Sequence, residues 1–177
     1  MEKFELLKEL GAGDFQHLNG SLEAHLKGTE CLLKKWGSSD LLQVAGLFHA
    51  AYGTAGFDET MVSLNQRKEI AKVIGIDEEA LVYLYCSCDR DFVFPQFESN
   101  SRIRFRDRFD GRQFDLDEST TRLFCELTVA NELELVLASD DFKSKYGAEL
   151  LELFKSMHRY LSPNARKSYA EALINIA

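Results

Sequence analysis

Apolar side chains recur at helical spacing through two successive segments, and each segment places a histidine on its apolar face. His25 falls between Leu22 and Thr29 in the segment LNGSLEAHLKGTECLLKKWG. His49 shares a stripe with Leu42 in the segment SSDLLQVAGLFHAAYGT. Spacings of three and four residues are typical of one face of an α-helix, so both rings are expected to project into a helical core. Because a buried imidazole needs a polar partner, the two rings are expected to share one environment.

Two interpretations of this pair remain open. Both histidines can be structural, each hydrogen-bonded inside the core, or they can form a functional pair, since clustered histidines are typical of ligand and catalytic sites. Tyr52 lies three residues after His49 and can reach the same pocket. A histidine beside a phenol can perform acid–base chemistry without a metal. We therefore take His25, His49 and Tyr52 as candidate catalytic residues, while Tyr52 can equally anchor its helix end through a hydrogen bond.

The rest of the chain is predicted to be mainly α-helical. Gly, Ser and Asp residues mark the expected helix ends. The expected helices cover residues 2–10, 16–36, 39–52, 63–74, 78–89, 117–138, 145–161 and 163–175. The stretch GTAGFDETMVSLN has turn residues and few apolar anchors, which predicts a loop over the end of the two histidine helices.

One segment has the period of a β-strand instead. From Arg102 to Phe109 cationic residues alternate with mainly apolar ones, and Asp110-Gly111 favours a tight turn, so a small inserted β-hairpin is expected over about 102–116. Its polar face carries four cations, Arg102, Arg104, Arg106 and Arg108. Arg104 and Arg106 are candidate ligands for a phosphate or carboxylate group. Neutralisation by nearby acidic residues and protection of an exposed strand edge are the alternatives.

Composition limits the classes of protein to consider. A chain of 177 residues predicts one domain over 1–177, with no apolar run long enough for a membrane and no secretory leader. We therefore expect a cytoplasmic protein whose four cysteines are thiols. The formal net charge of −8 argues against a nucleic-acid partner. No membrane partner is expected, and the oligomeric state is open.

The phrases HLKGTECLLKKWG, AGLFHAAYGT and LVYLYCSCDR together resemble the HD-domain superfamily of helical, metal-dependent phosphohydrolases. The resemblance covers about residues 17–139 and is closest to an uncharacterised group of HD-like domains with an FHxxYGT motif. The superfamily uses a His, a later His-Asp pair and a distant final Asp. His25 and His49 match the histidine positions, whereas Ala50 replaces the Asp of the pair and Asn131 is the nearest polar residue to the last position.

This resemblance implies an HD-like helical bundle with a pocket between the helices that carry His25, His49 and Asn131. Two imidazoles and an amide are a poor catalytic metal site, so we expect no bound metal. The expected function is binding of a small anionic molecule, or slow chemistry on it, with Asp89 and Arg90 as further ligand-binding candidates. Arg90 can clamp an anion or can pair with a carboxylate such as Glu126 or Glu132.

Two other functions stay open at this point. The first is a metal-dependent phosphohydrolase or oxygenase that holds a divalent ion at His25 and His49 and recruits a carboxylate such as Asp89. The second is a non-catalytic protein-interaction module whose pocket is filled by side chains. Metal content distinguishes the first alternative from the expected function, and the volume of the pocket distinguishes the second.

Overall fold

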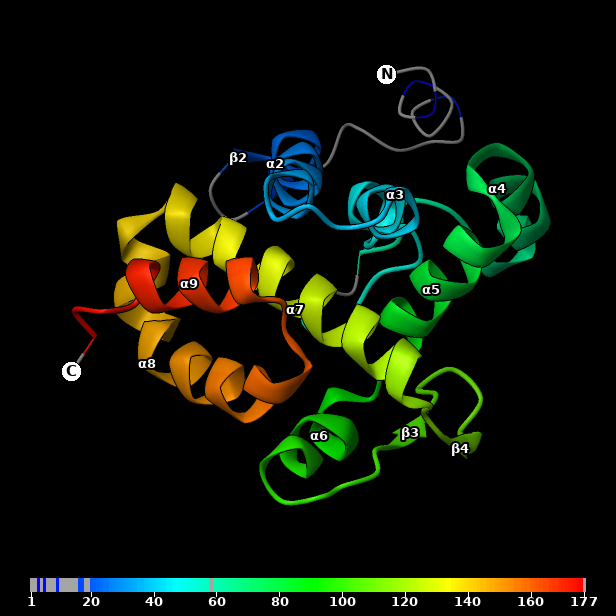
Figure 1. Cartoon of the computed structure of the whole chain (residues 1–177). Helices are drawn as coiled ribbons and strands as arrows, with labels where there is room; N and C mark the ends of the chain where they lie inside the picture. Colours follow the sequence, from blue (N-terminus) through cyan, green and yellow to red (C-terminus); the bar gives the residue numbers. More distant parts are fainter. Residues whose placement is uncertain are drawn as a thin grey trace.

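The computed structural model describes residues 3, 5, 9, 16–17, 20–57 and 59–176. It is mainly helical with a small antiparallel hairpin, as the sequence predicts (Figure 1). The predicted helix over 2–10 falls largely outside the described residues. The helices are α2 (Leu22–Lys35), α3 (Asp40–Phe48), α4 (Arg67–Ile74), α5 (Ile76–Ser87), α6 (Arg90–Val93), α7 (Glu118–Ala138), α8 (Asp140–Met157) and α9 (Pro163–Ala172). The 3-10 helices are η1 (Leu64–Gln66), η2 (Phe94–Glu98) and η3 (His158–Tyr160), and the strands are β1 (Gln16–His17), β2 (Gly20–Ser21), β3 (Arg104–Arg106) and β4 (Gln113–Asp115).

Both histidine helices are shorter than predicted. The expected start at residue 16 is wrong, because β1 pairs antiparallel with β2 and α2 begins only at Leu22, after the weak helix former Gly20. The expected end of α3 at Tyr52 is also wrong, since the helix ends at Phe48. Beyond it the backbone tightens into bonds of the i to i+3 type, from Ala51 N to Phe48 O and from Gly53 N to Ala50 O, and Gly53 has a φ of +75°.

Side-chain caps set most of the other helix boundaries. Ser39 accepts a hydrogen bond from Leu42 N, and Asp117 accepts one from Thr120 N, which confirms the predicted starts of α3 and α7. The C-terminal pair of helices is confirmed as well, with Ser162 capping α9. However, α8 begins at Asp140 and not at 145, because Ser139 caps it and two aspartates occupy its first turn.

The hairpin lies in the predicted segment. Phe105 faces Phe114 in the register of β3 and β4 and is fully buried, so the predicted alternation is confirmed. Asp107 also faces inward and is 1% exposed. It accepts hydrogen bonds from Tyr83 Oη at 2.6 Å and from Phe109 N at 2.7 Å, which hold the loop between the strands against α5.

The long helix α7 runs through the middle of the molecule and packs against α2, α3, α8 and α9 (Figure 1). Near its N-terminal end Phe124 contacts a group of aromatic rings from α5, η2 and β3: Tyr85, Phe94, Phe97 and Phe105. This aromatic group joins the hairpin and η2 to the helical body. No helix among the described residues is long and apolar enough to span a membrane.

Candidate functional site

A cavity of about 780 Å³ lies where α2, the end of α3, α6, η2, α7 and α8 meet. His25, His49 and Asn131 all line it, so the three positions that the sequence predicts to share a pocket do so. The loop residues Thr54 to Phe57 form part of its wall, which confirms that this segment lies over the histidine helices. Thr54 and Phe57 hold that loop closed through two backbone hydrogen bonds of 2.7 and 3.1 Å.

His25 is 5% exposed and both of its ring nitrogens contact side-chain oxygens from α7. Its Nδ1 contacts Oε2 of Glu134, and its Nε2 lies 2.8 Å from Oδ1 of Asn131. A carboxylate and an amide oxygen are both acceptors, so two side-chain oxygens of α7 hold this ring, one at each nitrogen.

His49 is a neutral, buried ring that binds a backbone carbonyl group. It is 2% exposed, and its Nδ1 donates to the carbonyl oxygen of Gly46 at 2.7 Å. Burial, followed by the nearby charge of His25, lowers the pKa of His49 from 6.5 to about 3. The neutral ring therefore keeps Nε2 unprotonated as an acceptor at neutral pH. The two rings meet edge to face with their centroids 5.2 Å apart.

Asn131 connects this pair to a buried phenol. Its Nδ2 donates to Oη of Tyr85 at 2.8 Å, while its Oδ1 faces His25. The ring of Tyr85 lies 5.7 Å from that of His49. Burial raises the pKa of Tyr85, so this phenol stays protonated and fixes the orientation of the Asn131 amide. His25, Asn131 and Tyr85 are therefore linked by hydrogen bonds at the histidine end of the cavity.

Asp89 and Arg90 both line the cavity, as the sequence predicts for ligand-binding residues, but each already has an ionic partner. Arg90 Nη1 lies 3.3 Å from Glu132 Oε1, one of the two carboxylates that the sequence analysis proposes for it. A Cβ at Gly56 would lie 2.7 Å from Arg90 Nη1, so a larger residue there would require the guanidinium to shift. Asp89 caps α6 and accepts from Nε of Arg106 at 2.8 Å.

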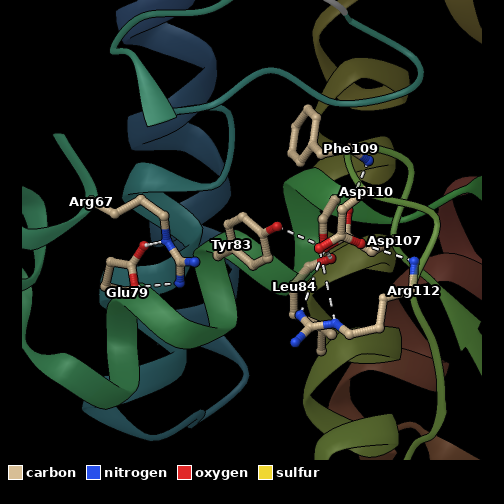
Figure 2. Close-up of polar contacts among 9 residues, drawn as sticks. Arg67, Glu79, Tyr83, Leu84, Asp107, Phe109, Asp110 and Arg112 are labelled. Carbon is tan, nitrogen blue, oxygen red and sulfur yellow. Dashed lines mark hydrogen bonds and ion pairs between the residues drawn. The ribbon is translucent and has the colours of Figure 1, made fainter. Parts of the chain in front are cut away.

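The structure places Tyr52 away from this cavity. Tyr52 is buried and donates to Oε1 of Glu79 at 2.8 Å, and burial raises its pKa. Glu79 also accepts two hydrogen bonds from Arg67, at 2.7 and 3.0 Å, and the guanidinium lies 3.6 Å from the centre of the Tyr83 ring (Figure 2). Because α3 ends before Tyr52, the helical spacing that placed it beside His49 does not apply, and the phenol joins this second network.

The hairpin arginines do not line the cavity either. Arg104 pairs with Asp115 across the strands at 3.1 Å, and both side chains are about half exposed. Arg106 pairs with Asp89 and lies over the ring of Phe92. Neutralisation by acidic neighbours, one of the alternatives from the sequence, therefore describes these two residues better than ligand binding does.

The residues that the sequence does not place at the site include Tyr85, Glu132 and Glu134. Glu134 lies three positions after Asn131, so both project from one face of α7, and this spacing could have identified it. A Cβ at Gly28 on α2 would lie 2.8 Å from Cγ of Glu134. The close approach of the two helices at this glycine lets the carboxylate reach His25.

The donor set does not fit the metal that an HD-like site would imply. Both nitrogens of His25 face acceptor oxygens, and Nδ1 of His49 is bound to Gly46, so Nε2 of His49 is at most one imidazole ligand. Ala50 lines the cavity without a donor atom. Within the described part of the chain, no group of three His, Cys, Asp or Glu residues could hold a metal ion.

Burial of His49 predicts a loss of stability in mild acid. Below pH 6.5 the unfolded chain binds a proton at this position that the native state, with a pKa of about 3, does not bind. The free energy of unfolding should therefore fall as the pH falls from 6.5 toward 3, by about 2 kcal/mol at pH 5 from this residue. Urea denaturation at pH 7 and pH 5 measures the loss.

The His49→Gln variant should lose this part of the pH dependence. His158→Gln, a change at an exposed histidine, should retain it and serves as the control. An unchanged pH dependence in His49→Gln would contradict the neutral, buried state of His49.

Residues 6–90 match a family that is described as "Domain of unknown function (DUF6817)", which is slightly less than half of the chain. No curated protein and no solved structure matches the chain. The matched segment contains both histidines and ends at Arg90, so the residues of α7 that complete the cavity lie beyond it.

Proposed function

We propose that this chain is an HD-like helical domain that binds a small organic molecule in the cavity beside His25 and His49, without a metal centre. One observation carries the proposal: the hydrogen-bonded histidine cluster lines a cavity of about 780 Å³. That volume is in the range of small-molecule sites. It argues against the interaction module with a filled pocket. Two successive histidine helices and a later polar helix meeting at one pocket support the HD-like relationship.

Binding is favoured over acid–base catalysis as the main role. A histidine with a pKa of about 3 is a weak general base at neutral pH, because proton-transfer catalysis is most effective when the pKa lies near the working pH. The same ring is a constant hydrogen-bond acceptor. The proposal includes a cytoplasmic location, which the four free thiols support, and it includes neither a nucleic acid nor a membrane as partner.

A thermal-shift screen tests the proposal. The probes are representatives of four classes: amines, carboxylic acids, sugar phosphates and nucleotides. At least one class should raise the melting temperature, since a ligand that binds the folded state stabilises it. Leu153→Trp, which places an indole in the cavity, should abolish the shift.

Leu151→Trp is the matched control, because Leu151 is half-buried on the same helix but outside the described lining of the cavity. It should keep the shift. If none of the four classes raises the melting temperature, or if both tryptophan variants keep the same shifts, the cavity is not a binding site.

A further inference from the structure

We infer that the ligand of this cavity is a small organic amine and not an anion. The inference rests on the proposed binding function and goes beyond it by assigning the chemical class. Its first support is the charge of the lining, which contains six carboxylates, from Asp89, Asp91, Glu98, Glu132, Glu149 and Glu152, and one guanidinium, from Arg90. The whole chain has 29 acidic and 21 basic residues, so the cavity is far more acidic than the chain around it.

The existing ion pairs leave part of this negative charge uncompensated. Arg90 neutralises Glu132, and Arg106, from outside the cavity, neutralises Asp89. Among the ion pairs of the described residues, none includes Asp91, Glu98 or Glu149. These three exposed carboxylates come from α6, η2 and α8, so several elements of the lining contribute negative charge. An anionic ligand would be repelled from this position, and a cation would be attracted.

The apolar part of the lining suits an organic cation better than an inorganic one. The rings of Phe57, Phe94, Phe142 and Tyr146 contribute to the wall. Phe142 and Tyr146 lie one helical turn apart on α8 with their ring centroids 4.8 Å apart. Aromatic faces attract ammonium groups and also pack against the hydrocarbon body of an amine. A hydrated metal ion has no apolar surface to bury against these rings.

The histidine cluster selects the protonated amine among organic cations. His49 is neutral, and Nδ1–H is bound to Gly46, so its Nε2 accepts a hydrogen bond and cannot donate one. Glu132 and Asn131 add acceptor oxygens to the same end of the cavity. A primary or secondary ammonium group supplies N–H donors to such acceptors, which a quaternary ammonium lacks.

Three probes that share a benzyl group test the charge directly: phenethylamine, phenylethanol and phenylacetate. Isothermal titration calorimetry at low salt should show that phenethylamine binds more tightly than the alcohol, and that phenylacetate binds weakest. The affinity for the amine should fall as salt is added, because the carboxylates at the mouth are exposed. Glu98→Gln combined with Glu149→Gln should weaken amine binding by about tenfold.

The matched control combines Glu69→Gln with Glu171→Gln, which removes the same charge at exposed positions outside the cavity lining. It should leave the affinity unchanged. Equal weakening in both double variants would reduce the effect to general attraction by an acidic protein and would overturn the inference.

The inference and the proposed function can fail separately. Tightest binding by phenylacetate or phenylethanol, blocked by Leu153→Trp, would overturn the amine class and leave the binding function in place. Absence of any thermal shift across the four classes of the screen would remove both.

Discussion

Phe124→Ala is expected to lower the free energy of unfolding by about 3–5 kcal/mol, the largest loss we predict for a single substitution. Phe124 is 1% exposed and contacts four other aromatic rings from three elements. Removing its ring leaves a cavity that this rigid group cannot close by small shifts, so both the transfer energy and the packing contacts are lost. Urea denaturation at pH 7, followed by tryptophan fluorescence, measures the change.

The Phe124→Ala substitution should also disturb the candidate site, because Phe94 contacts Phe124 and lines the cavity. Leu137→Ala on the same helix is the control. Leu137 is 60% exposed, and its truncation should change stability by less than about 0.5 kcal/mol. Losses of similar size in the two variants would mean that the aromatic group does not hold the hairpin and η2 to α7.

The second large effect concerns metal. Protein purified without added ions should contain far less than one equivalent of iron, manganese or zinc, because the cavity lacks the carboxylates that complete an HD-type site. Ala50→Asp combined with Asn131→Asp replaces the two missing groups. If the HD-like relationship holds, this double variant should take up a divalent metal in near-stoichiometric amount, since each new carboxylate adds a charged ligand beside the histidines.

Elemental analysis after dialysis against each metal measures this gain. Ala51→Asp combined with Asn131→Asp is the control, since Ala51 is buried but is not part of the described cavity lining. Both double variants must remain folded by circular dichroism for the comparison to count. Stoichiometric metal in the wild-type protein, lost in His25→Ala, would restore the metal-dependent hydrolase or oxygenase as the better function.

The sequence predicts those features of the fold that depend on neighbouring residues. Helical periodicity identifies the two histidine helices, capping residues such as Ser39 and Asp117 identify helix starts, and strict alternation identifies the buried side of the hairpin. The prediction fails at residues 16–17, 20–21 and 49–52, where a helix is expected and the backbone forms strands or turns instead. Tertiary packing and glycine conformation outweigh helix propensity at such boundaries.

The candidate site also combines features that the sequence predicts with features that it does not predict. Residue spacing and the resemblance together predict that His25, His49 and Asn131 line one pocket, as they do. The ionic partner of Arg90 is Glu132, one of the two carboxylates that the sequence suggests. The contact of His25 with Glu134 spans 109 positions, and it depends on how closely α2 approaches α7 at Gly28. No local pattern encodes that distance.

The charge of the cavity is also decided only in three dimensions. The sequence displays a row of arginines and thereby favours an anionic ligand. In the structure Arg104 pairs with Asp115 and Arg106 pairs with Asp89, and neither arginine lines the cavity. The carboxylates of α6, η2 and α8 become neighbours only when these elements pack around α7. Sequence thus determined the helices, the caps and the histidine pair, which rest on local periodicity, whereas side-chain partners and electrostatic character depend on which distant surfaces meet.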